Sequence, residues 1–168
     1  TVSFALHLAV LAALGEDPAT ALVALTAPEA PGIDPALTAL SKVATVVTSG
    51  RRLQGLAEAL ALGLTELSRR PCFSLEGGQL RHGPMEMLGP AVGVVLFRGQ
   101  DSTAGLVTAM AVSAVETGAP VIIFDASGEA PIAGAVTIGF KQTIGANDAL
   151  RTGSYSKTLT FTLSTTAP

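Results

Sequence analysis

Charged and aromatic residues are scarce in this 168-residue chain. Only 14% of the residues are charged and 4% are aromatic, and tryptophan is absent. Apolar residues make up 48%, more than a free-standing soluble domain usually needs to fill its core. We therefore expect part of the apolar surface to be covered, by a second copy of the chain as a homodimer or by a companion domain.

Clustered positive charge and paired cysteines are also missing. The net charge is −3 and the basic residues are scattered, which excludes the electrostatic footprint of a nucleic-acid-binding protein. The single cysteine, Cys72, rules out an internal disulfide and fits a reducing compartment, so we expect a cytoplasmic protein. No Cys, His or carboxylate cluster has metal-ligand spacing, so we expect neither a metal nor a cofactor.

Long apolar runs are absent too. No uninterrupted run approaches the roughly 20 residues that cross a bilayer, so no membrane span is expected. The apolar residues 2–14 lack the basic flank of a signal segment and are interpreted as a buried helix. With a second helix near 18–27 and a short one over 34–40, they form an N-terminal helical segment, 1–40, which we interpret as a linker from a preceding domain.

Residues 41–150 alternate between short β-branched runs and helical segments, which predicts βαβ units. Strands are expected at 43–47, 72–75, 92–97, 121–124 and 135–138, with longer helices at 53–69 and 102–117. This order predicts a doubly wound, flavodoxin-like sheet of five parallel strands between two helical layers. Ligands of such sheets bind beyond the carboxyl ends of the strands. The tail, 151–168, fits either a final helix or an extended end.

His82 lies in a polar segment, 77–87, and is followed by Gly83-Pro84. Histidine exchanges protons near neutral pH, and the Gly-Pro bend can aim its side chain into a cleft. The simpler alternative is a histidine on a loop that faces solvent.

Glu66 is a second candidate, near the end of the helix predicted over 53–69. The helix carries a stripe of leucines at steps of three and four residues, formed by Leu53, Leu56, Leu60, Leu64 and Leu67. Glu66 lies off this leucine stripe and shares its face with Ala59, Leu62 and Gly63. Burial of a lone carboxylate there would suit it to act as a general base near neutral pH. The alternative is an ordinary ion pair with Arg69 or Arg70, three or four residues further on.

The two candidates belong to one longer pattern. Thr65-Glu66-Leu67-Ser68 followed by Gly78-Gln79-Leu80-Arg81-His82-Gly83-Pro84 resembles the sugar isomerase (SIS) domain family, most closely the second SIS domain of glucosamine-6-phosphate synthases. In that family a Lys-Glu-Ile-Ser helix end precedes Gly-Glu-Leu-Lys-His-Gly-Pro at the same spacing. The resemblance needs no gap between Ala59 and Pro84 and extends more loosely over 43–140.

The resemblance implies a phosphosugar isomerase, aminotransferase or deglycase that moves a proton between C1 and C2 of an open-chain sugar phosphate. Glu66 matches the family's general base, and His82 matches a histidine that assists ring opening from across a subunit interface. Arg81 takes the place of the motif's lysine. Ser49 and Gly50, after the first strand, could donate hydrogen bonds to the substrate. A non-catalytic sugar-phosphate-binding or regulatory module, or a purely structural dimerisation domain, is the alternative.

The chain also departs from the family pattern. Gly63 stands where the family has a lysine, and Gln79 stands where it has a glutamate. The loop after the third strand lacks the family's Ser/Thr-rich phosphate cradle. Its Ser102 and Thr103 open a predicted helix, where they could bind phosphate. They fit equally well as helix caps, because the neighbouring Asp101 would repel an anion.

Overall fold

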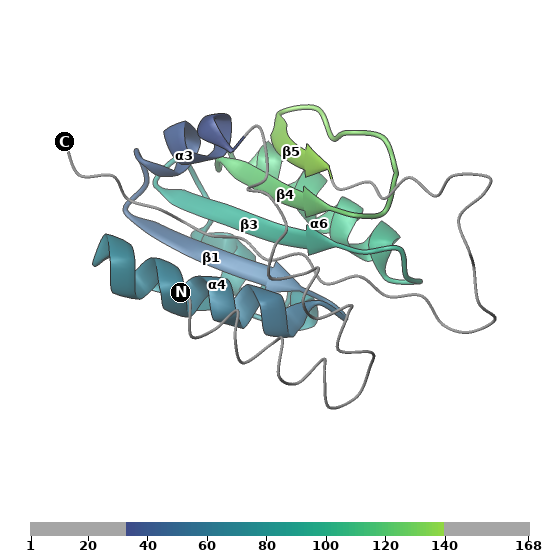
Figure 1. Cartoon of the computed structure of the whole chain (residues 1–168), viewed down its shortest axis with the longest axis horizontal. Helices are drawn as coiled ribbons and strands as arrows, with labels where there is room; N and C mark the ends of the chain where they lie inside the picture. The colour runs from purple at the N-terminus through teal and green to yellow at the C-terminus, as the bar shows by residue number, and fades with distance from the viewer. Residues whose placement is uncertain (1–32, 140–168) are drawn as a thin grey trace, which may run out of the picture. The chain divides into compact units, whose positions relative to one another are not determined.

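A computed structural model describes residues 33–139 of the chain (Figure 1). The helices predicted over 2–14 and 18–27 and the tail 151–168 lie outside these residues. No helix within residues 33–139 is long and apolar enough to cross a bilayer.

The described residues alternate between helices and strands as far as β4, as the sequence predicts, and β5 follows β4 without a helix between them. The elements, in chain order, are α3 (Asp34–Leu40), β1 (Thr45–Gly50), α4 (Gln54–Ser68), β2 (Cys72–Ser74), α5 (Gly77–Arg81), the 3-10 helix η1 (Pro84–Met87), β3 (Val92–Arg98), α6 (Ala104–Glu116), β4 (Val121–Asp125) and β5 (Ala135–Gly139).

The five strands form one sheet in the order β2-β1-β3-β4-β5, and all four pairings are parallel. This confirms the predicted doubly wound sheet. The chain moves outward from β1 to β2 and then crosses back to β3 on the other side of β1. The crevice beyond the carboxyl ends of β1 and β3 is the place where such sheets bind ligands.

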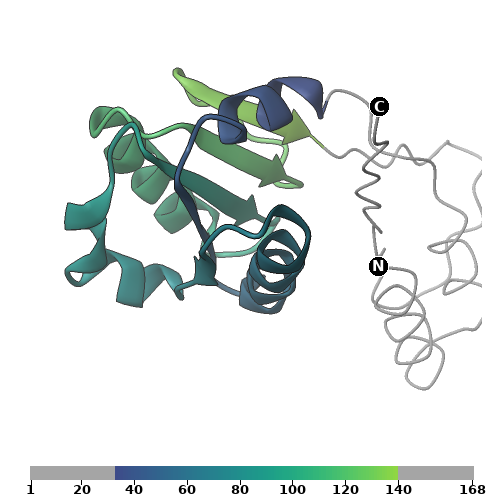
Figure 2. The same ribbon diagram turned by 90° about the vertical axis from the view of Figure 1, so that its left-hand side faces the viewer.

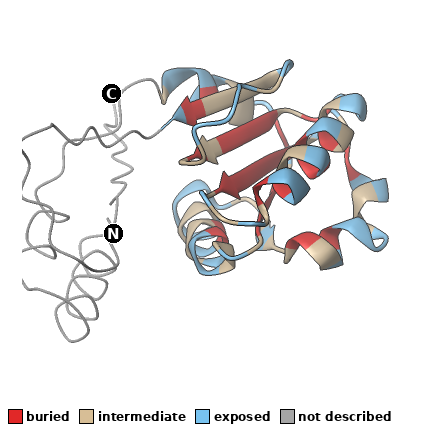
Figure 3. Cartoon of the chain, turned by 90° about the vertical axis from the view of Figure 1, so that its right-hand side faces the viewer, coloured by how far each residue is buried: buried red, intermediate tan, exposed pale blue. Residues whose placement is uncertain are grey.

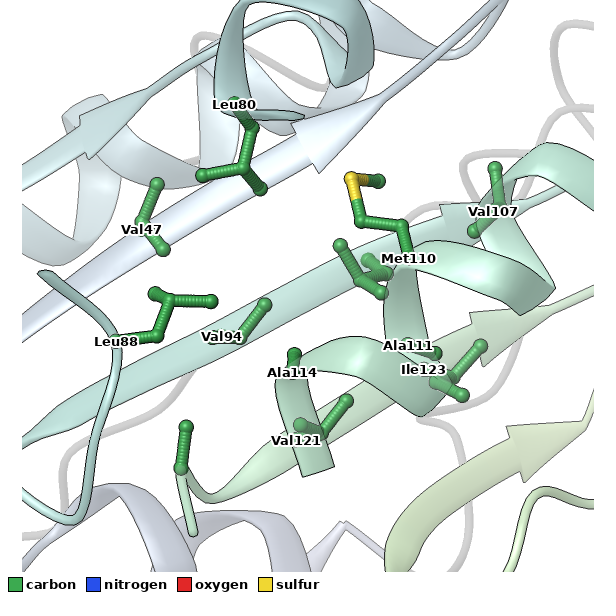
Figure 4. Packing of buried hydrophobic residues seen from close by; sticks show 12 residues of the cluster. Val47, Leu80, Leu88, Val94, Val107, Met110, Ala111, Ala114, Val121 and Ile123 are labelled. Carbon is green, nitrogen blue, oxygen red and sulfur yellow. The ribbon is translucent and has the colours of Figure 1, made fainter. Parts of the chain in front are cut away.

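The helices cover the sheet in two layers, which Figure 2 shows edge-on. Val46 and Val95 pack with Ala36 of α3 and Ala57 of α4 on one face. The next residues in the two strands belong to the other face, because side chains alternate along a strand. There the core consists of Val47, Leu80, Leu88, Val94, Leu96, Val107, Met110, Ala111, Ala114, Ala119, Val121 and Ile123, most of them drawn in Figure 4.

Burial follows the same layers, with the central strands buried and the outward faces of the helices exposed (Figure 3). In α4 the innermost residues are Ala57 and Ala61, whose small side chains let the helix lie close to the sheet. The predicted leucine stripe is wider than the buried face. Leu56 and Leu67, which lie on the edge of the stripe away from Ala57 and Ala61, are exposed.

Two parts of the predicted secondary structure are wrong. The first strand begins and ends later than the predicted 43–47. Thr48, Ser49 and Gly50, which the sequence placed after the first strand, pair in register with β3. The polar segment 77–87 is not an open loop but holds α5 and η1.

Candidate functional site

The carboxyl end of β1 carries one buried hydroxyl without a partner in the described residues and one N–H that is bonded to a side-chain amide. Ser49 is fully buried, and within residues 33–139 its hydroxyl has no hydrogen-bond partner. The Gly50 N–H donates to Gln54 Oε1 at 3.2 Å. A Cβ on Gly50 would lie 2.9 Å from the carbonyl carbon and oxygen of Leu53, so the turn into α4 closes this tightly only around glycine. Ser49 and Gly50 thus lie together at the predicted ligand-binding end of the sheet.

Gln54, the first residue of α4, covers this end of the strand. Its Nε2 donates to Ser74 Oγ at 2.9 Å, and Ser74 Oγ donates to the Thr48 carbonyl at 3.2 Å. Sequence reasoning missed Gln54 and Ser74, because only the fold brings the start of α4 beside β2. The acceptor on the Gly50 amide is a neutral amide oxygen, the kind of group that an oxyanion can replace.

Glu76 holds the start of α5, the helix that leads to His82. Its carboxylate accepts from the Gly78 N–H at 2.6 Å, and Gln79 Oε1 accepts from the Glu76 N–H, which completes a capping box. Arg51 Nη1 donates to the same carboxylate at 2.8 Å. Burial would raise the pKa of Glu76, but the bonds from Gly78 and Arg51 outweigh it and hold the pKa below its usual value.

His82 follows α5 directly and caps its carboxyl end with backbone bonds to Gly78 and Gln79. Its side chain is exposed and makes no hydrogen bond or ion pair with the other described residues. Arg81 is exposed beside it. Gly83 then turns the chain with a φ of 120°, a left-handed conformation that favours glycine. The imidazole is therefore presented outward from a fixed backbone.

Glu66 lies on the outermost line of α4, directly opposite the buried alanines. Steps of four, three and four residues place Gly55, Ala59, Leu62 and Glu66 on this line. Leu62 is 62% exposed, and a Cβ on Gly55 would meet nothing within 4 Å. The carboxylate of Glu66 is exposed and makes no ion pair within residues 33–139.

The alternative ion pair of Glu66 is not formed. Arg70 instead donates to the carbonyls of Leu40 and Val43, both at 3.1 Å. Arg69 ends α4 in a left-handed conformation with a φ of 56°. Glu66 is thus a lone carboxylate on an otherwise small and apolar helix face, as the sequence indicated, but the burial expected there is not supplied by the described residues.

A single copy does not bring Glu66 and His82 together. Helix α4 lies on one face of the sheet, whereas α5, anchored by buried Leu80, lies on the other (Figure 2). Glu66 is also near the amino ends of the strands, because its neighbour Thr65 donates a hydroxyl bond to the carbonyl of Cys72, the first residue of β2. Ser49 and Gly50 are at the opposite end. A site that uses Glu66 and His82 together requires another surface.

In the loop after β3, the two hydrogen-bond donors of Thr103 are already bonded to Asp101. Asp101 Oδ1 accepts from the Thr103 N–H at 2.7 Å and from the Thr103 hydroxyl. These two bonds hold the pKa of Asp101 below its usual value. Ser102 is exposed. A carboxylate thus already holds the two donors of Thr103 at the start of α6, and its charge opposes binding of a phosphate there.

Arg98, the last residue of β3, is the largest fully buried side chain among residues 33–139, at 1% exposure. Its Nε donates to Asp125 Oδ1 at 2.8 Å, and its Nη1 donates to Glu129 Oε2 at 3.2 Å and Thr108 Oγ1 at 3.1 Å. Its Nη2 donates to the Ala130 carbonyl. Arg98 therefore ties the segment between β4 and β5, residues 126–134, to the end of β3. The sequence signal was available: an arginine and an aspartate each end an otherwise apolar strand.

Asp125 makes the stability of this fold sensitive to acid. Burial would raise its pKa, but bonds from Arg98 and Ser127 outweigh this and hold the pKa below the ordinary 3.8. A carboxylate with a lowered folded-state pKa contributes stability that is complete above its unfolded value and is lost as the pH falls through the folded one. We expect the free energy of unfolding to drop below pH 3.8, measured by urea titration at several pH values. An Asp125→Asn variant should show a shallower drop; an equally steep one would contradict the assignment.

No group of three His, Cys, Asp or Glu side chains in the described residues is arranged to hold a metal ion.

The family model for the SIS domain matches residues 39–167. No match to a curated protein was found.

Several solved structures of proteins named for phosphorylated sugars share this fold. The C-terminal domain of glucosamine-fructose-6-phosphate aminotransferase from Francisella tularensis is 19% identical over 64% of this chain and 31% of its own, with a TM-score of 0.58. Tagatose-6-phosphate ketose/aldose isomerase from Escherichia coli is 22% identical over 74% and 40%, with a TM-score of 0.54.

Glucosamine-6-phosphate deaminase from Thermotoga maritima is 16% identical over 80% of this chain and 45% of its own, with a TM-score of 0.59. The chain thus spans less than half the length of each of these three structures. At these identities the likeness establishes the fold.

Proposed function

The chain belongs to the SIS domain family, and we propose that it acts on a sugar phosphate as an aldose–ketose isomerase or a related aminotransferase or deglycase. One observation carries the proposal: the buried, unpartnered Ser49 hydroxyl lies beside the Gly50 N–H at the switch point of the sheet. A phosphate or sugar oxygen would satisfy the hydroxyl and replace the Gln54 amide oxygen on Gly50. The solved structures that share the fold are named for phosphorylated sugars, which supports this class of ligand.

In this proposal Glu66 is the base. Its carboxylate takes the proton from C2 of the open-chain aldose phosphate while O1 gains a proton, which gives an enediol. It exchanges its proton with solvent and then delivers one to C1 while O2 loses its proton, which completes the ketone. His82 places a proton on the ring oxygen as the ring opens, and Arg81 beside it would attract the charged substrate. Because Glu66 and His82 lie on opposite faces of the sheet, we propose that each works with a residue from a second copy or from a companion SIS domain. The exposed leucines of α4 fit such a covered surface.

Binding is tested first by thermal unfolding of the full chain with hexose, hexosamine and pentose phosphates. We expect one class to raise the melting temperature, since a ligand at 100 times its Kd stabilises the folded state by about 2.7 kcal/mol. The matching unphosphorylated sugar should leave the melting temperature unchanged.

Two hydroxyl deletions locate the binding. Ser49→Ala removes the unpartnered hydroxyl, so it should leave the stability of the free chain nearly unchanged but reduce the ligand-induced shift. Thr137→Val is the matched control, because Thr137 in β5 carries the other buried hydroxyl that has no partner within residues 33–139. This variant should leave the shift intact. Equal shifts in both variants would contradict a site at Ser49.

Turnover separates an enzyme from a binding module. In heavy water an isomerase replaces the proton at C2 of the sugar phosphate by deuterium, which proton NMR follows directly. Binding without deuterium uptake, with every sugar phosphate that binds, would instead support the regulatory module. The placement of Glu66 and His82 on opposite faces of one copy favours that second candidate.

A further inference from the structure

Arg51 is the first residue after β1 and has no role in the proposed proton transfer. Its guanidinium is directed not toward solvent but across to the start of α5, where Nη1 meets Glu76 Oε1 at 2.8 Å. The Arg51 side chain lies against Gly77 and Gly78, the first two residues of α5. A Cβ on Gly77 would be 3.0 Å from Arg51 Cδ and Nε, and one on Gly78 would be 3.3 Å from Nη1. The two glycines therefore make room for the arginine.

Helix α5 has two attachments to the rest of the domain. Leu80 is fully buried and inserts into the core with Val47 and Val94 (Figure 4). Glu76, at the other end of the helix, is held by Arg51. A helix of five residues with a single buried side chain can pivot about it, so the second attachment fixes the direction of the helix.

The carboxylate of Glu76 links that attachment to the helix backbone. One of its oxygens accepts from Arg51 and the other accepts from the Gly78 N–H. The Gly78 carbonyl in turn accepts from the His82 N–H at 3.1 Å. A continuous set of bonds thus runs from the turn after β1 to the backbone of His82.

We propose that Arg51 is a positioning residue for His82, and that it couples the turn at the end of β1 to the direction in which the imidazole is presented. The consequence of this coupling for ligand binding rests on the proposed function, which places a sugar phosphate at Gly50, next to Arg51. A phosphate there would compete with Glu76 for the guanidinium and loosen the start of α5. Binding at β1 would then move His82, although the two have no direct contact.

The test observes His82 by NMR in the full chain. The chain has two histidines, His7 and His82, so a His7→Gln variant assigns the two imidazole signals. In Arg51→Gln we expect the imidazole signal of His82 to shift or broaden. Amide exchange of Gly78 should accelerate by about tenfold, the usual effect of weakening a helix cap. Glu76→Gln should do the same, and Arg51→Lys, which keeps the charge, should restore part of the wild-type behaviour.

Arg52→Gln is the matched control. Arg52 carries the same charge on the same turn but is exposed and has no ion pair within residues 33–139. It should leave the His82 signal and Gly78 exchange unchanged. If Arg51→Gln also leaves both unchanged, or if Arg52→Gln changes both as strongly, the positioning role is overturned.

Inorganic phosphate is the probe for the coupling. Titration into the wild type should shift both the Gly50 amide and the His82 imidazole signals. In Arg51→Gln only the Gly50 amide should respond, which would support the coupling. A His82 response in Arg51→Gln equal to that of the wild type would overturn it. If Gly50 does not respond in either protein, the phosphate site and its coupling to His82 both fail, while the ligand-free comparison still decides the positioning role.

Discussion

Replacing Arg98 by methionine is expected to lower the free energy of unfolding by about 3–5 kcal/mol, since loss of one partner leaves a buried charge unpaired. Methionine fills much of the same volume, so the loss reports the charge and not a cavity. Asp125 would remain buried with only Ser127 to support its negative charge. The exposed Glu129 can turn to solvent, since 46% of its side chain is already accessible.

Urea unfolding of the wild type and three variants measures this effect. Arg52→Met removes an exposed arginine and should change the free energy of unfolding by at most about 0.5 kcal/mol. The double variant Arg98→Met with Asp125→Asn should recover part of the stability, because it removes both charges together. A double variant less stable than Arg98→Met alone would show that the buried charge of Asp125 is not the cause.

Replacing Glu66 by glutamine is expected to slow deuterium uptake by the sugar phosphate by about 10²–10⁴-fold, the usual contribution of a general base. The amide has nearly the same shape but cannot accept the proton from carbon. Glu66 is exposed and unpaired in the described domain, so the fold and the ligand-induced thermal shift should be retained. Turnover equal to the wild type would end the assignment of Glu66 as the base.

Mixing variants tests whether Glu66 and His82 come from different copies. Glu66→Gln and His82→Gln should each be inactive alone. In a mixed symmetric dimer, one site receives both substitutions and the other receives neither, so random exchange of subunits should restore about a quarter of the wild-type rate. If subunit exchange is verified and activity still does not recover, a companion domain and not a second copy supplies the missing residue.

The sheet could be predicted from the sequence because its central strands are buried on both faces. Runs such as Val92–Phe97 and Val121–Phe124 are almost entirely apolar, which is the pattern of parallel strands under two helical layers. Strand ends were harder to place. Thr48 belongs to β1 because it pairs with Val95 of β3. Its hydroxyl donates to the Ala57 carbonyl of α4, a bond that no local pattern reveals.

Helix α5 could not be predicted from the sequence. It has five residues, two of them glycine, and its amino end is capped by a glutamate whose charge is balanced by Arg51, 25 residues earlier. Such a cap depends on a contact between the turn after β1 and the start of α5 that only the folded chain provides. The spacing between Glu66 and His82 likewise suggested both residues as candidates but could not place them on opposite faces of the sheet. That depends on which layer each helix joins.

Residues 126–134, which join β4 to β5 without a helix, show what Arg98 contributes to folding. A connection with no internal hydrogen-bond ladder loses conformational entropy when it becomes ordered and gains little locally in return. Here contacts between residues far apart in the sequence offset that loss of conformational entropy. Arg98 donates to Glu129 and Ala130, and Ile132 packs on the core. Within residues 33–139, β5 is the outermost strand beside β4, and we expect its attachment to the sheet to depend in part on this ion-pair network. Arg98, at the end of β3, thus adds to the pairing with β4 that holds β5, the last strand of the described residues.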